Sequence, residues 1–113
     1  MPNSLLLLLG VKTNPIEYRY SFPWLFDLLA GCGVRYLQLG SFFEAYQLPD
    51  EYFLRLREEA EERGLSFASL FTAHRELGGF LVEDPAWQAV ARRNYERYIV
   101  IGALLGAASV GSN

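Results

Sequence analysis

Short apolar runs alternate with longer amphipathic segments along the chain, and this alternation is the strongest constraint on the fold. The apolar residues over 5–11 are continuous, which is typical of a strand that is buried on both faces. Further short apolar runs over 34–39, 65–71 and 107–110 predict three more strands. The first three runs begin about 30 residues apart, which is the length of one βα unit. The alternation therefore predicts an α/β fold with a parallel sheet and crossover helices.

The segments between these runs carry the start and stop signals of three helices. Ser21 and Asp50 can each cap the start of a helix, and Gly33 and Gly64 can end the same two helices. A third helix is expected over 85–105. The inner faces of the three helices are predicted to contain, in chain order, Trp24, Leu25, Leu28 and Leu29; Phe53, Leu56 and Ala60; and Trp87, Val90, Ala91, Tyr98, Ile101 and Leu105.

The composition fits one globular domain over residues 1–113. Hydrophobic residues make up 51% of the chain and charged residues 20%, which excludes a disordered chain. The single cysteine, Cys32, excludes an internal disulfide framework. The net charge of −3 provides no global positive field for a phosphate backbone, and this disfavours a nucleic-acid partner.

Two apolar segments lack features that targeting signals require. No Lys or Arg precedes the five leucines over 5–9, as it would in a secretory signal peptide. The apolar run over 99–110 is shorter than the roughly 20 residues of a membrane span. We therefore expect a soluble, cytoplasmic chain without a membrane partner.

Ligands of parallel α/β proteins bind at the carboxyl ends of the strands, and this rule selects the candidate site. The four predicted strand ends should bring their following segments to one rim. These segments contain Lys12, Thr13, Asn14 and Glu17; Ser41, Phe42, Phe43 and Glu44; Thr72, His74, Arg75 and Glu76; and Ser112 and Asn113.

No complete catalytic set appears among these residues. His74, the only histidine, is the one side chain whose ordinary pKa lies near neutrality, yet a lone histidine in a loop is more often a hydrogen-bonded surface residue. Glu44 and Glu76 could form a carboxylate pair, although their separation in sequence does not establish one. The chain has no H-x-x-x-H pair, Walker loop or G-x-S-x-G motif, so we predict no metal site built from this chain alone.

Taken together, four segments resemble the amino-terminal half of the xylose-isomerase-like TIM-barrel superfamily, which contains sugar phosphate isomerases and epimerases and endonuclease IV. The segments, in chain order, are LLLLLGVKTN, LLAGCGVRYLQLGSF, LREEAEERGLSFASLFTAH and IVIGALLGAASVGSN. They resemble the family's first strand, first helix with second strand, second helix with third strand, and third helix before the fourth strand. The resemblance implies a partial (β/α) barrel of about four strands and three helices.

The resemblance also implies roles for particular residues. His74 matches a histidine at the end of the third strand, where the family places a substrate-facing group, and is predicted to be catalytic. Gln38 and Glu44 match polar positions of the second strand. The family's fourth strand commonly ends in a histidine before a glycine, whereas this chain has Ser109 and Val110 there. The predicted substrate-binding set is Lys12, Asn14, Gln38, Glu44, Thr72 and Arg75.

Three functions remain open. The first is a fragment of a metal-dependent sugar or sugar phosphate isomerase or epimerase, which transfers a proton next to a carbonyl and is inactive alone. The family's metal ligands lie on later strands, so a divalent metal is expected for the full-length parent and none for this chain alone. The second is a non-enzymatic half-barrel that self-associates through exposed sheet edges. The third is an endonuclease IV-like DNA-repair fragment, which the net charge disfavours.

Overall fold

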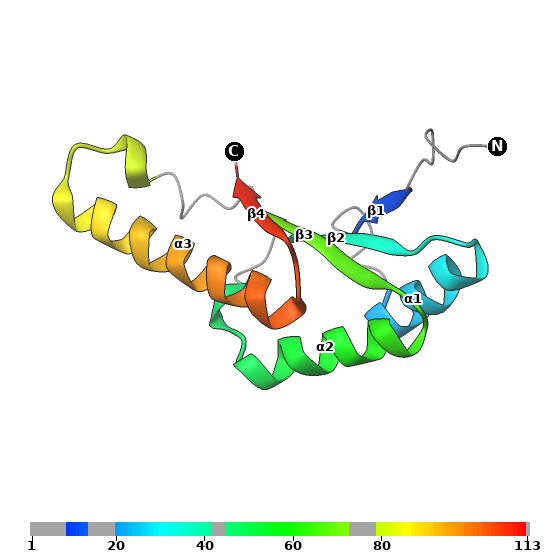
Figure 1. Cartoon of the computed structure of the whole chain (residues 1–113). Helices are drawn as coiled ribbons and strands as arrows, with labels where there is room; N and C mark the ends of the chain where they lie inside the picture. Colours follow the sequence, from blue (N-terminus) through cyan, green and yellow to red (C-terminus); the bar gives the residue numbers. More distant parts are fainter. Residues whose placement is uncertain (1–8, 14–19, 42–44, 73–78, 113) are drawn as a thin grey trace.

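Four parallel strands form one sheet at the centre of the structure. The computed structural model describes residues 9–13, 20–41, 45–72 and 79–112. The strands are β1 (Gly10–Lys12), β2 (Tyr36–Ser41), β3 (Ser66–Thr72) and β4 (Ser109–Ser112). They lie in the order β1-β2-β3-β4, and each neighbouring pair is parallel (Figure 1). The predicted α/β fold with a parallel sheet is confirmed.

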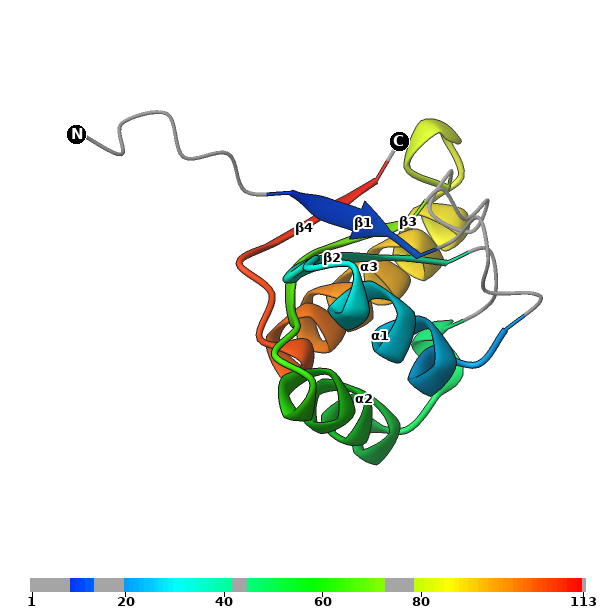
Figure 2. The same cartoon turned by 90° about the vertical axis from the view of Figure 1, so that its right-hand side faces the viewer.

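Three α-helices cover one face of this sheet. They are α1 (Phe22–Gly31), α2 (Asp50–Glu62) and α3 (Pro85–Leu105), and a short 3-10 helix, η1 (Ala45–Gln47), precedes α2. Viewed along the sheet, all three helices lie on the same side of the strands (Figure 2). The opposite face of the sheet has no α-helix among the described residues, and we call it the open face.

The hydrophobic core lies between the sheet and the helices. Strands β2 and β3 direct apolar side chains toward the helices, which bury large rings and branched chains against them. The largest of these buried residues are Phe26, Leu37, Phe53, Leu65, Leu70, Tyr98, Ile101 and Leu105.

Each of the three helices ends in the same backbone motif, and this motif explains why the strands begin later than predicted. Gly33, Gly64 and Gly106 have positive φ angles of 79°, 75° and 76°. The next residue then donates its N–H back to the helix, as Val34 does to the Leu29 carbonyl at 3.0 Å. Residues 34, 65 and 107 therefore belong to the helix caps, so the predicted strands over 34–39, 65–71 and 107–110 are each shifted toward the carboxyl end.

The first predicted strand, over 5–11, is only partly described. Strand β1 covers Gly10–Lys12, and residues 5–8 lie outside the described part of the chain.

One predicted helix cap is confirmed and another is wrong. Ser21 caps α1, because its side chain accepts the Trp24 N–H at 3.3 Å. The prediction that Asp50 caps α2 is wrong: Pro49 occupies the cap position and Asp50 is the first helical residue. The Asp50 carboxylate instead accepts a hydrogen bond from Arg97 on α3 at 2.6 Å.

Two arginines tie the helices to one another. Arg97 also donates to the Leu48 carbonyl at 2.8 Å, so it holds the segment before α2 against α3. Arg63 donates to the Asp27 carboxylate at 2.6 Å and joins the end of α2 to α1. This hydrogen bond raises the pKa of the Arg63 guanidinium above its ordinary value.

Four residues predicted for the inner helix faces are exposed instead. Trp24 and Leu28 lie at the surface of α1, which buries Leu25, Phe26 and Leu29. The other two, Trp87 and Val90, lie in the first turns of α3. The 21 residues of α3 span about 32 Å, whereas the seven residues of β3 span about 23 Å. The first turns of α3 therefore extend past the sheet (Figure 1).

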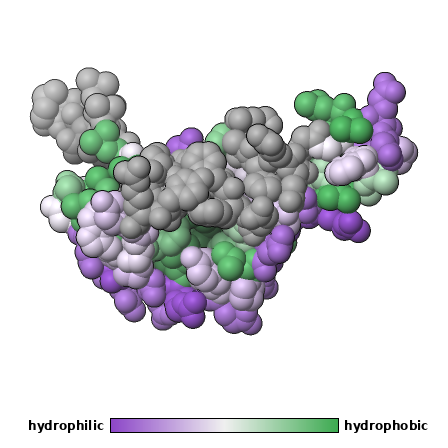
Figure 3. Space-filling model, turned by 180° about the vertical axis from the view of Figure 1, so that it is seen from behind, coloured by the Kyte–Doolittle hydropathy of each residue, from purple (hydrophilic) through white to green (hydrophobic). Residues whose placement is uncertain are grey.

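The projecting end of α3 carries exposed apolar side chains, and an apolar patch is visible there in the space-filling view (Figure 3). The patch contains Phe80, Leu81, Val82, Trp87 and Val90, of which Leu81 is 91% exposed. Among the described residues, none of the helices is both long and apolar enough to span a membrane.

We predict that Gly102→Ala destabilises the protein, although glycine-to-alanine changes inside helices ordinarily stabilise by about 1 kcal/mol. A Cβ atom at Gly102 would overlap Cγ2 of Val110, where α3 packs on β4. Overpacking of this kind costs about 1–3 kcal/mol, so the free energy of unfolding, measured by urea denaturation, should fall.

Gly31→Ala is the matched control, because a Cβ at that helical position meets no atom within 4 Å. This variant should be as stable as the parent or more so. Val110→Ala should recover part of the stability of Gly102→Ala. Equal stabilisation by Gly102→Ala and Gly31→Ala would refute the close approach of α3 and β4.

Candidate functional site

A β-bulge in β3 determines which side chains reach the open face. Leu37 pairs with Phe67, but the next residue of β2, Gln38, pairs with Ser69, so Ala68 is an extra residue in β3. Before the bulge Phe67 is buried against the helices, and after it Leu70 is buried there. Ser69 therefore lies on the open face instead of in the core.

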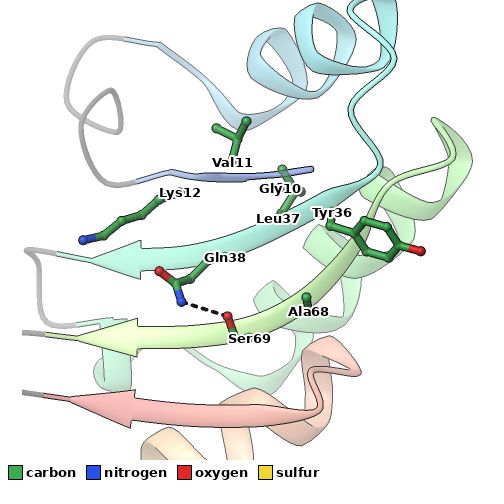
Figure 4. Close-up of a pocket in the computed structure, with 8 residues that line it drawn as sticks. All are labelled: Gly10, Val11, Lys12, Tyr36, Leu37, Gln38, Ala68 and Ser69. Carbon is green, nitrogen blue, oxygen red and sulfur yellow. Dashed lines mark hydrogen bonds between the residues drawn. The ribbon is translucent and has the colours of Figure 1, made fainter. Parts of the chain in front are cut away.

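Gln38 and Ser69 form a hydrogen-bonded pair on the open face. The Gln38 Nε2 donates to the Ser69 Oγ at 2.9 Å, and both side chains are partly buried (Figure 4). The Gln38 amide oxygen and the second Nε2 hydrogen remain as acceptor and donor capacity beyond this bond. The pair can therefore both donate to and accept from a ligand with hydroxyl groups.

Lys12 lies beside this pair, at the end of β1. It is in register with Gln38, and its side chain extends toward the carboxyl ends of the strands (Figure 4). Its Nζ lies 4.6 Å from the centroid of the Phe71 ring, which is the geometry of a cation–π interaction. Phe71 follows the bulge, so this contact also depends on the shift in β3.

Thr13 fixes the ends of β1 and β2 to each other. Its side chain is 0% exposed, and its Oγ1 accepts the Gly40 N–H at 3.1 Å and lies 3.2 Å from the Gly40 carbonyl, to which it donates. The Thr13 N–H donates to the Gln38 carbonyl at 3.0 Å. The backbone that follows Lys12 and Gln38 is therefore held in place before any ligand binds.

These residues surround a wide, open hollow of about 470 Å³ on the sheet. Its lining combines small, polar and apolar groups, as expected of a site for a small molecule that has both carbon and hydroxyl surfaces. The residues that line it are Gly10, Val11, Lys12, Tyr36, Leu37, Gln38, Ala68 and Ser69.

The structure brings two of the predicted substrate-binding residues together, Lys12 and Gln38. Thr72 is separate from them: its side chain is 1% exposed, and its hydroxyl lies 3.5 Å from the Tyr98 hydroxyl of α3. Asn14, Glu44 and Arg75 lie outside the described residues, and so does the predicted catalytic residue, His74. Their roles, and that of Thr72 in substrate binding, stay predictions.

Ser69 and Phe71 were not predicted from the sequence. Strict alternation in β3 would place Phe67, Ser69 and Phe71 on one face, so the two residues could not be assigned to the open face without the bulge. The only available signal was the pair of small residues, Ala68 and Ser69, within an otherwise apolar strand.

The described residues do not fit a metal ion. Nowhere in 9–13, 20–41, 45–72 and 79–112 do three His, Cys, Asp or Glu side chains come together as metal ligands would. We therefore assign no chemical step to a metal in this part of the molecule.

The chain was compared with known families, curated proteins and solved structures. No family model and no curated protein matches it. A crystal structure of D-psicose 3-epimerase in the presence of D-fructose is similar, with a TM-score of 0.73 and 17% sequence identity. The match covers 91% of this chain and 36% of the epimerase chain, so this chain spans about a third of that protein. The similarity and the four-stranded sheet confirm the predicted partial TIM-barrel fold.

We predict that Thr13→Val lowers the free energy of unfolding by about 1–3 kcal/mol, because the Gly40 N–H would be left buried without a partner. Valine has nearly the same shape as threonine, so the loss reports on the hydroxyl. Chemical denaturation measures it. Thr13→Ser retains the hydroxyl and should lose less; if serine and valine are equally harmful, the hydroxyl does not hold the two strands together.

Proposed function

We propose that this half-barrel is the substrate-facing wall of a sugar isomerase or epimerase, and that further strands complete the barrel. The observation that carries the proposal is the Gln38–Ser69 hydrogen-bonded pair on the open face of a sheet whose fold matches part of an epimerase. In parallel α/β barrels, ligands bind at the carboxyl ends of the strands, and Lys12 and Gln38 are near those ends.

The chemistry of the open face supports a polyhydroxylated ligand. Sugar hydroxyls donate and accept hydrogen bonds at once, and the Gln38–Ser69 pair offers both kinds of group on a backbone held by Thr13. The Phe71 ring and Ala68 offer apolar surface beside them for the carbon skeleton. The role of these residues is to bind and orient the substrate.

The described residues of the open face do not form a complete catalytic centre. A TIM barrel needs about eight strands and about 250 residues, whereas the described sheet has four strands. The proton transfer and the divalent metal of the complete enzyme belong, in this proposal, to residues beyond those described. His74 is our candidate for a substrate-facing group on the third strand, as the family resemblance implies. We expect the chain alone, supplied with divalent metal and ketoses, to show no turnover.

A second candidate is a half-barrel that pairs with a second copy of itself. It is favoured by the two sheet edges, β1 and β4, because β1 of one copy beside β4 of another would continue the parallel strand order. Light scattering separates this candidate from the first: a defined dimer supports self-association, and a monomer counts against it.

We predict that the 113-residue chain binds D-fructose and that Gln38→Leu weakens this binding about tenfold. Leucine removes both polar atoms of the amide at similar size, so the loss reports on hydrogen bonding. Titration followed by NMR measures the dissociation constant.

Gln88→Leu is the matched control. Gln88 lies on α3, where its side chain donates to the Val82 carbonyl, away from the open face. It should leave D-fructose binding unchanged. An absence of binding to the parent chain, or equal effects of the two variants, would contradict the proposed function.

A further inference from the structure

We propose that the projecting end of α3 is an interface for a second copy of this chain, and that the two copies meet through the same apolar patch. The patch is the one defined above: Phe80, Leu81, Val82, Trp87 and Val90. None of these residues lines the hollow on the open face, so the inference goes beyond the proposed function and is independent of it.

The patch continues the core-facing side of α3. Ala91, Tyr98 and Leu105 follow one another at intervals of seven residues along this helix, and all three are buried. Trp87 lies one turn before Ala91 on the same side of the helix, yet it is 61% exposed. Trp87 is therefore oriented like a core residue, at a place that the described sheet does not reach.

The segment before α3 packs directly against the helix. A Cβ atom at Gly79 would lie 2.6 Å from the Trp87 carbonyl oxygen, so a glycine is needed for this close approach. The Phe80 ring meets the Tyr95 ring edge-on, with the ring centroids 6.2 Å apart. The patch is therefore formed before a partner arrives, which lowers the entropic cost of binding.

The exposed apolar area matches a small dimer interface. Leu81 is 91% exposed and Phe80 is 50% exposed. At about 150–250 Å² for a large side chain, the exposed parts of the five residues amount to roughly 500 Å² in each copy. Two copies would together bury about 1,000 Å², which is near the lower limit for a specific interface. We therefore expect a dissociation constant in the micromolar range.

A second copy explains the patch better than further units of the same barrel do. Helix α2 has 13 residues and is about 20 Å long, whereas α3 has 21 residues and is about 32 Å long. Barrel units as long as β2 and α2 therefore end before the first turns of α3. A second molecule can approach from beyond the end of the sheet. Because both copies use the same patch, the contact is two-fold and closes at a dimer.

The test is the self-association of the 113-residue chain between about 10 and about 500 μM, measured by sedimentation velocity. The parent chain should change from monomer to dimer over this range. Leu81→Glu should weaken the dimer at least tenfold, because the contact would bury a carboxylate among apolar side chains. Since Leu81 is 91% exposed, this variant should retain the melting temperature of the monomeric parent.

Leu54→Glu is the matched control. Leu54 is 49% exposed on α2, outside the patch, and the substitution adds the same charge. This variant should dimerise as the parent does.

The fluorescence of Trp87 distinguishes the patch from the sheet edges as the site of contact. The chain has two tryptophans, so Trp24→Phe leaves Trp87 as the sole one. The emission of this variant should shift to shorter wavelength as the dimer forms, because the Trp87 ring leaves water. Adding Leu81→Glu should abolish the shift at the same concentrations.

Three results would overturn the inference. The first is a parent chain that stays monomeric at the highest concentration. The second is a dimer whose Trp87 emission does not shift, since the edges β1 and β4 would then make the contact. The third is equal weakening of the dimer by Leu81→Glu and Leu54→Glu. None of these results bears on the binding of D-fructose to the open face.

Discussion

One extra residue in β3 determines the character of both faces of the sheet. Because Ala68 is bulged, Phe67 and Leu70 both enter the core, while Ser69 and Phe71 reach the open face. The Gln38–Ser69 hydrogen bond and the Lys12–Phe71 contact follow directly from this shift. With strict alternation, Ser69 would lie in the core and Leu70 on the open face. Bulges re-aim side chains near ligand sites in many sheets, and this one brings Ser69 beside Gln38 on the open face.

The helices pack against the face of the sheet that lies opposite the open face. Glycines with positive φ end each helix and return the chain to the sheet. Arg97 fixes the segment before α2 to α3, and Arg63 fixes α2 to α1, so the three helices form one connected layer. Thr13 provides the corresponding restraint within the sheet, where β1 is only three residues long. The sheet is therefore packed against a core on one face, and in the described part of the chain no helix covers the other.

The fold could be predicted from the sequence more fully than the site. The alternation of apolar runs and capped helices was sufficient for the parallel sheet and for α3, because those signals are local. The strand starts were wrong where residues such as Val34 complete a helix cap, and Trp87 was misplaced because a long helix extends past a short sheet. Ser69 and Phe71 were missed because a bulge depends on pairing with β2, which no single segment reveals. Lys12 was predicted because it lies at the end of an apolar run, whereas Gln38 was predicted only from the family resemblance.

The proposed function requires that a sugar binds the open face and not the helix layer. Backbone amide NMR during addition of D-fructose tests it most directly, since each amide reports on its own surroundings. The account predicts shifts that cluster at Lys12, Gln38 and Ser69, while amides of α2 such as Glu58 and Glu62 stay unchanged. Shifts confined to the helices, or none along the sheet at saturating sugar, would contradict it.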